Sequence, residues 1–142
     1  MNAVAIGETD LQRLLAGLAP ELAARPRAIR SQPTGEAVPA DAIMLFREQE
    51  GVTVVVVVDE VAADAVAFDR TRDEALWAQI TLRIHSSLEA VGMLAAIANA
   101  LAARDIPCNA VSAYYHDHLF VPWVRRDDAI TALRELSEGT AT

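Results

Sequence analysis

The three histidines of the chain and one aspartate are the side chains best suited to chemistry. His116, Asp117 and His118 are consecutive, and His85 stands at the end of an alternating segment that starts at Trp77. Imidazole nitrogens bind zinc, nickel or copper, and a carboxylate can complete or orient such a set. One hypothesis is therefore a metal site of His85, His116 and His118 with Asp117. The two histidines that flank Asp117 straddle a tight turn, which can point them apart.

The same residues fit two further interpretations. A histidine beside Asp117 suits general acid–base catalysis, but the sequence offers no credible nucleophile, because Ser86 and Ser87 fit better as helix caps. Alternatively, the imidazoles and the carboxylate satisfy backbone groups of a turn and a helix start. We expect no catalytic residues and no cofactor, and we predict that the protein is not an enzyme.

A fourth interpretation is the capture of a small anionic or zwitterionic ligand at a helix start. The Ser-Ser-Leu-Glu run at 86–89 is a capping box and predicts a helix to about Arg104. The free N–H groups and the positive dipole end of such a helix favour a carboxylate. Asn109, on the strand expected beside this helix, could hold an amino group or an amide through its side-chain oxygen.

The elements that must position these residues are clearest in the second part of the chain. Its predicted elements are a strand at 77–84, a helix at 86–104, strands at 106–115 and 118–122 joined by a turn at 116–117, and a helix from 127 or 128 to about 136. The order β-α-β-β-α is a ferredoxin-like unit without its last strand. We expect the N-terminal strands, or else a second chain, to cover that open sheet edge.

The first part of the chain predicts a helix, a sheet and a connection. The expected elements are a helix that Thr9 opens and Pro20 ends or bends, a strand at 27–30, a loop at 31–41, a hairpin of strands 42–48 and 52–58, a short helix at 60–66 capped by Asp59, and a polar linker at 69–74. The unbroken valine run 54–58 indicates a strand that is covered on both faces. We therefore expect a further layer or another subunit over that strand.

Composition excludes several classes of function. The chain has 142 residues, 53% of them apolar, and a formal charge of −8, which argues against nucleic acid and anionic lipid as partners. Its single cysteine, Cys108, rules out an internal disulfide and fits a buried, unreactive thiol. The N-terminus does not resemble a signal peptide, and no apolar stretch approaches the roughly 20 residues that span a bilayer. We expect a cytoplasmic protein.

Two sequence runs carry a resemblance to a known family. Residues 80–92 (ITLRIHSSLEAVG) and 109–122 (NAVSAYYHDHLFVP) resemble a bacterial family of small tandem ACT-domain proteins, and segments 11–22 and 47–54 resemble its first half. The family is distantly similar to the ACT pairs of aspartate kinases and eukaryotic arginine sensors. The resemblance implies an α+β fold of two ferredoxin-like halves, 1–72 and 76–142, with antiparallel sheets and helices packed on one face.

The resemblance also implies a ligand site and a function. In those relatives the ligand lies by the first strand–helix turn and the following strand, which correspond here to Ser86, Ser87 and Leu88 and to Cys108 and Asn109. The usual Asp and Gly of that turn are replaced by the His-Ser-Ser run at 85–87. The implied protein is a non-catalytic sensor of a small molecule, most simply an amino acid.

The sequence also leaves an assembly and two alternative functions open. We expect a homodimer, formed through sheet edges or through the small-residue helix face of Gly92, Ala96 and Ala100. The alternatives to a sensor are a metal-binding protein that uses the three-histidine edge and a pure interaction module with the 114–120 hairpin as its contact surface.

Overall fold

The computed structural model describes residues 7–59, 68–69 and 74–140. In chain order its elements are α1 (Leu11–Ala16), β1 (Pro20–Leu22), β2 (Arg27–Gln32), β3 (Met44–Arg47), β4 (Val52–Val57), β5 (Phe68–Asp69), β6 (Glu74–Ala75), β7 (Trp77–Leu82), α2 (Met93–Ala102), β8 (Asn109–Ser112), β9 (Asp117–Pro122), the 3-10 helix η1 (Trp123–Arg125) and α3 (Arg126–Thr140).

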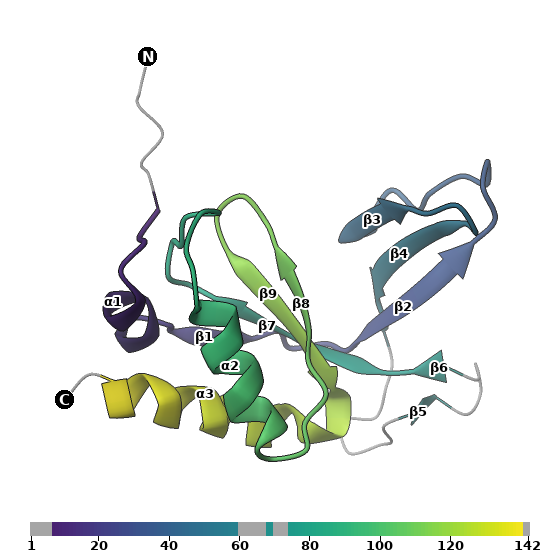
Figure 1. The fold of residues 1–142 in the computed structure, drawn as a ribbon. Coiled ribbons are helices and arrows are strands. Elements are labelled where there is room, and N and C mark those ends of the chain that lie inside the picture. The colour runs from purple at the N-terminus through teal and green to yellow at the C-terminus, as the bar shows by residue number, and fades with distance from the viewer. Residues whose placement is uncertain (1–6, 60–67, 70–73, 141–142) are drawn as a thin grey trace.

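One antiparallel sheet joins the two parts of the chain. Its strand order is β3-β4-β2-β7-β9-β8, and β1 also pairs with β7. Strand β7 alternates as predicted: Ala78, Ile80 and Leu82 are buried in the core, which also contains side chains of α1, α2 and α3. The three helices therefore cover one face of this sheet, while the β2-β3-β4 end curls away from them (Figure 1). The predicted α+β, ferredoxin-like fold class is confirmed.

The second part of the chain has its missing strand supplied from the first. It follows the predicted order β7-α2-β8-β9-α3, and within the described residues no strand follows β9. Strand β1 pairs antiparallel with β7, with Pro20 opposite Leu82 and Leu22 opposite Ile80. The prediction that N-terminal residues close this sheet edge is confirmed.

Helix α1 is shorter than predicted and has a different cap. Asp10, not Thr9, is the N-cap, and its carboxylate accepts a hydrogen bond from the Arg13 backbone N–H at 3.0 Å. The helix ends at Ala16, and Ala19 has a left-handed φ of 44°, which redirects the chain into β1 at Pro20. The leucine periodicity thus runs through a helix, a turn and a strand.

Helix α2 begins seven residues after the predicted capping box starts. Its N-cap is Gly92, which has a φ of 96°, and the Ser86 hydroxyl that was expected to cap it donates to Asp117 instead. Residues 83–92 therefore form a loop. Leu88 and Val91, which fall within the predicted helix at 86–104, are 64% and 82% exposed.

The turn of the β8–β9 hairpin lies nearer to β8 than predicted. Asp117 is the first residue of β9 rather than part of the turn, and the turn lies at 113–116, where the Ala113 N–H donates to the His116 carbonyl at 3.0 Å. Tyr114 and Tyr115, which fall within the predicted strand at 106–115, both lie exposed in this turn. After β9, helix α3 starts at Arg126 and continues to Thr140, past the predicted end near residue 136.

The first part of the chain contains the predicted β2 strand and the β3–β4 hairpin. Val54, Val55 and Val56 of β4 are all buried, as expected for a strand covered on both faces. The segment predicted as a linker is bounded by paired strands, since Asp69 of β5 lies opposite Glu74 of β6. The short helix predicted at 60–66 lies outside the described residues.

Candidate functional site

A small pocket lies where the loop after β7 meets helix α2. Its volume is about 100 Å³. Three segments build it: the loop at 86–92, the first turn of α2, and the facing ends of β8 and β9. Its lining residues are Ser86, Ser87, Leu88, Ala90, Gly92, Met93, Leu94, Ala95, Ser112 and Asp117.

Asp117 is the buried charge of this pocket. Only 6% of it is exposed, and its carboxylate accepts hydrogen bonds from the hydroxyls of Ser86 at 2.8 Å and Ser112 at 2.6 Å. Ser112 and Asp117 are directly opposite across the β8–β9 ladder, so they share the helix-covered face of the sheet. Among the described residues, no cation forms an ion pair with this carboxylate.

The N-terminus of α2 supplies unused hydrogen-bond donors to the same pocket. Gly92 provides no side-chain cap, and the first N–H bonded within this turn is that of Ala96, which donates to the Gly92 carbonyl at 3.0 Å. Within the part of the chain that the structure describes, the N–H groups of Met93, Leu94 and Ala95 form no hydrogen bond. The first N–H groups of a helix and its dipole favour negative charge.

The N-terminal segment of the chain holds the pocket loop in place. The Glu8 N–H donates to the His85 carbonyl at 2.8 Å, and the Ser87 N–H donates to the Glu8 carbonyl at 3.0 Å. A Cβ atom at Gly7 would lie 2.5 Å from the backbone carbon of Ser86, so only glycine allows this approach. The loop conformation thus depends on residues almost eighty positions earlier.

The structure brings together only part of the site predicted from sequence. Ser86, Ser87 and Leu88 line the pocket, but Cys108 and Asn109 do not. Asn109 is exposed at the far end of β8, opposite Phe120. Cys108 packs against the core, where burial raises the pKa of its thiol. Ser112 and Asp117 occupy the place expected for Asn109.

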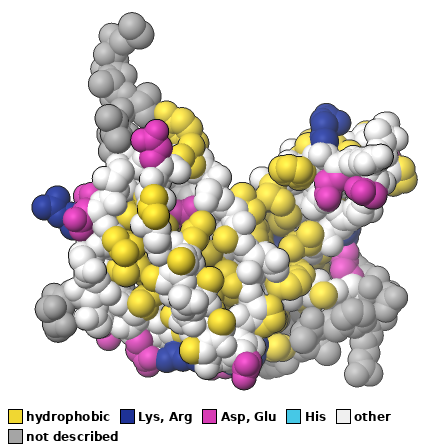
Figure 2. Space-filling model, in the orientation of Figure 1, with side chains coloured by type: hydrophobic (Ala, Val, Ile, Leu, Met, Phe, Trp, Pro, Cys, Tyr) yellow, Lys and Arg dark blue, Asp and Glu magenta, His cyan; other side chains and the backbone are white. Residues whose placement is uncertain are grey.

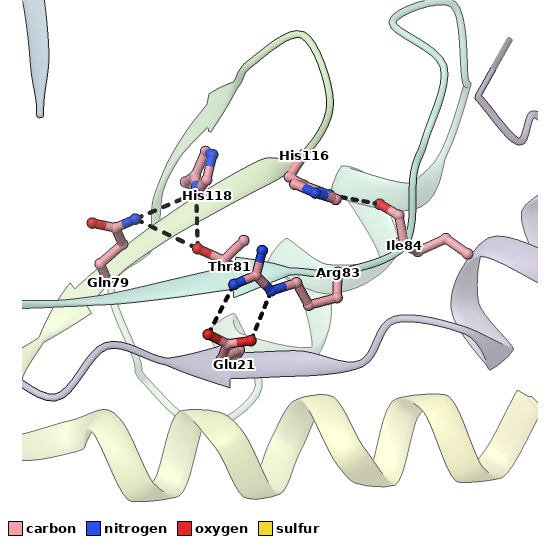
Figure 3. A network of polar contacts seen from close by, with 7 residues as sticks. All are labelled: Glu21, Gln79, Thr81, Arg83, Ile84, His116 and His118. Carbon is pink, nitrogen blue, oxygen red and sulfur yellow. Dashed lines mark hydrogen bonds and ion pairs between the residues drawn. The ribbon is translucent and has the colours of Figure 1, made fainter. Parts of the chain in front are cut away.

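The three histidines do not form the predicted metal site. His116 Nδ1 lies 3.4 Å from the Ile84 carbonyl oxygen, whereas His118 bonds to side chains of β7 (Figure 3). Asp117 and His118 are adjacent in a strand and so point to opposite faces of the sheet. Among the described residues, no group of three or more His, Cys, Asp and Glu side chains is arranged to hold a metal ion.

His118 belongs to a polar network on the helix-free face of the sheet. Its Nδ1 lies 2.9 Å from the Thr81 hydroxyl and 3.4 Å from Gln79 Nε2, and Arg27 Nε donates to Gln79 Oε1 at 2.9 Å. Burial lowers the pKa of His118, and the neighbouring charges of His116 and Arg83 add to this effect, while Asp117 opposes it. Neutral His118 is therefore the favoured form.

The fold and the pocket define a ferredoxin-like α+β protein with a polar pocket at the first strand–helix connection of its second part. Two ACT-domain family models match the chain, one over residues 77–135 and the other over residues 6–72. The chain belongs to the ACT-domain family, as its sequence runs indicated. ACT domains are typically regulatory modules that bind small-molecule ligands.

Several solved structures are similar to this chain. A Vibrio cholerae protein of unknown function, described as a possible transport protein, is 34% identical, with a TM-score of 0.65 over 86% of this chain and 92% of that one. A protein from Agrobacterium tumefaciens has the same fold at 17% identity, with a TM-score of 0.60 over 80% of this chain and 84% of that one. A putative C-terminal regulatory domain of aspartate kinase from Porphyromonas gingivalis gives 15% identity and a TM-score of 0.46, covering 83% of this chain and 96% of that one.

No curated protein matches the chain. None of the helices in the described ranges is long and apolar enough to cross a bilayer.

Proposed function

We propose that this chain is a non-catalytic regulatory protein that binds a small α-amino acid in the pocket that Ser86, Asp117 and the first turn of α2 line. The proposal rests on one observation: a helix N-terminus that favours negative charge and a carboxylate that favours positive charge line the same pocket of about 100 Å³. Unbonded N–H groups of α2 stand on one side and the Asp117 carboxylate on the other.

An α-amino acid has the charges that match this pair. Its carboxylate can accept hydrogen bonds from the Met93, Leu94 and Ala95 N–H groups, where the helix dipole favours an anion. Its ammonium group can donate to Asp117, whose two oxygens each keep an acceptor position beyond the serine bonds. A ligand with only one of these charges would leave the other feature unmatched.

The regulatory step that we propose is a change in the pocket loop. A ligand that bridges α2 and Asp117 favours the arrangement in which the loop, the hairpin and the N-terminal segment are packed together. Because the loop is bonded to Glu8, ligand binding stabilises contacts between the halves 1–72 and 76–142. We propose that the protein acts as a homodimer through its sheet edges, since Leu45 and Phe46 on the edge strand β3 are 37% and 64% exposed.

Calorimetric titration and thermal shift against the twenty amino acids test the ligand. We expect one or a few small amino acids to raise the melting temperature, and Asp117→Asn to abolish this effect by removing the charge that the ammonium group needs. Glu89→Gln is the matched control, because Glu89 is an exposed acid of the same loop outside the pocket lining. A flat response to every amino acid at millimolar concentration would refute the proposal.

A pure interaction module is the second candidate function. Tyr114 and Tyr115 are 59% and 56% exposed at the tip of the β8–β9 hairpin, and exposed aromatic residues are common at binding surfaces. A flat amino-acid response together with a stable complex that is lost in a Tyr114→Ser/Tyr115→Ser variant would favour this function.

A further inference from the structure

The curl of the sheet places its two end strands around one cleft. Strands β3 and β8 are the outermost strands of the order β3-β4-β2-β7-β9-β8, yet Met44 of β3 and Val111 of β8 line the same space of about 150 Å³. Figure 2 shows hydrophobic side chains gathered in the hollow between the β8–β9 and β3–β4 hairpins. This cleft lies on the helix-free face, away from the amino-acid pocket.

The lining of the cleft is mostly apolar and includes two polar side chains. Gln79 and His118 are polar, and the apolar lining residues are Ile43, Met44, Val111, Ala113 and Phe120. A volume near 150 Å³ is enough for a ring of about six heavy atoms, as apolar protein cavities of that size show. Both halves contribute to the walls, so an occupant of the cleft would touch both.

The hydrogen-bond network fixes which nitrogen of His118 carries the proton. Arg27 Nε can only donate, so the oxygen of the Gln79 amide must face it and the NH₂ group must face Thr81 and His118. His118 Nδ1 therefore accepts, both from this amide and from the Thr81 hydroxyl. The proton of the neutral ring is on Nε2.

This Nε2–H group is a donor with no partner among the described residues. Figure 3 shows the second ring nitrogen of His118 on the side away from Gln79 and Thr81. A single neutral donor in the lining of a mostly apolar cleft is best matched by one uncharged acceptor, because an ion would lose hydration there without a counter-charge.

We propose that the cleft binds a small uncharged molecule with an apolar body and one hydrogen-bond acceptor, such as a ketone, an ester or a lactone. The acceptor oxygen bonds to His118 Nε2–H, and the apolar body lies between Met44, Val111 and Phe120. Such a ligand bridges the two ends of the curled sheet. Its binding does not depend on the amino-acid pocket.

Methionine-methyl NMR gives a direct test, since the chain has three methionines. Met44 lines the cleft, and Met93 lines the amino-acid pocket, so one labelled sample reports both sites separately. The probes are cyclohexanone, cyclohexanecarboxylate and cyclohexylammonium at pH 8, which share a ring and differ in charge. We expect cyclohexanone to shift the Met44 signal saturably, with a dissociation constant on the order of 1 mM, and to leave Met93 unchanged.

The charged probes and two variants complete the experiment. Both ions should bind at least about tenfold more weakly than cyclohexanone. Val111→Trp should abolish the Met44 response by filling the cleft, whereas Asn109→Trp, on the same strand and face but outside the lining, should preserve it. Circular dichroism confirms that each variant is folded, and spectra recorded on dilution show whether it self-associates.

Three results would overturn the proposal. They are the absence of a saturable Met44 shift with cyclohexanone, equal binding of the carboxylate, and a response that survives Val111→Trp. A protein-dilution series without probe records any Met44 change that comes from dimerisation through β3, and a cyclohexanone shift no larger than that change would also overturn the proposal. The Met93 response to amino acids tests the proposed function independently.

Discussion

Replacing Asp117 with alanine removes the carboxylate that links the pocket loop to the β8–β9 hairpin. Two serine hydroxyls donate to it, and both the Ser86 and Asp117 side chains are buried to 6% exposure. A hydrogen bond to a charged group contributes about 1.5–3 kcal/mol, and a buried hydroxyl left without a partner costs about 1–3 kcal/mol. The exposed Ser112 can turn to water and contributes less.

These values predict that Asp117→Ala lowers the free energy of unfolding by about 2–4 kcal/mol. For a chain of this size the melting temperature should fall by about 5–15 °C. Ser86→Ala should cost about 1–2 kcal/mol. Because the two residues share a bond, the double variant should be about 1 kcal/mol or more less destabilised than the sum of the single variants.

Urea unfolding followed by circular dichroism measures all four proteins. Ser87→Ala is the matched control, since its hydroxyl is adjacent in sequence but only accepts from the Glu89 N–H at 3.1 Å. We expect this variant to lose less than about 1 kcal/mol. Additive effects of Ser86→Ala and Asp117→Ala, or a loss at Ser87 as large as that at Ser86, would refute the assigned network.

Four further predictions concern His118, Cys108 and the second half. Gln79→Glu places a carboxylate beside His118 Nδ1 and should raise the pKa of His118, because a nearby negative charge favours the protonated imidazole. NMR titration measures this pKa, and an unchanged pKa would contradict the network. Burial lowers the pKa of His118 below its unfolded value of 6.5, so neutral His118 contributes its full share of the folding stability above pH 6.5. This contribution should decline as the pH falls through the folded pKa. Urea unfolding midpoints measured against pH should lack this decline in His118→Gln. Burial also raises the pKa of the Cys108 thiol, so a disulfide reagent at pH 8 should react at least about tenfold more slowly than in urea, and equal rates would count against burial. Residues 76–142 alone lack β1 and should not form a stable monomer, which gel filtration and circular dichroism would show.

Strand β7 and the open edge beside it were predictable because both rest on local rules. Alternation from Trp77 to Leu82 identifies a half-buried strand whatever its neighbours are. Counting the elements that follow shows that one strand is missing. A hydrophobic sheet edge has to be covered, and the chain's own N-terminal residues are the nearest source.

The start of α2 was not predictable, because its signal is overridden by residues far away in sequence. The Ser-Ser-Leu-Glu run fits a capping box, but a cap needs the serine hydroxyl and a free loop backbone. The Ser86 hydroxyl donates to Asp117, the Glu89 N–H donates to Ser87 and not to Ser86, and the Ser87 N–H donates to the Glu8 carbonyl. Both partners are visible only in the folded chain. Gly92 was the one local indication of the true helix start in the sequence, since a glycine readily adopts the positive φ found at this N-cap.

The sequence indicated the loop residues of the candidate pocket but not the strand residues that face them. Its loop residues follow from the position of β7 in the sequence, and Ser86, Ser87 and Leu88, predicted at the helix start, line the pocket beside the first turn of α2. The facing residues depend on the register of the β8–β9 hairpin, and that register is set by a turn at 113–116. Moving the turn toward β8 makes Asp117 a strand residue opposite Ser112 and leaves Asn109 at the other end of β8.

The late start of α2 and the existence of the pocket have the same cause. If the helix began at Ser87, its first turn would occupy the space at 87–92, and the Ser86 hydroxyl would cap the helix rather than donate to Asp117. Bonds from Glu8 and the close approach of Gly7 hold the loop extended instead. The first N–H groups of α2 are thereby left unbonded beside a buried carboxylate. Residues 7–22 thus close the sheet of the second part through β1 and shape its pocket through the loop, so this pocket depends on residues from both parts of the chain.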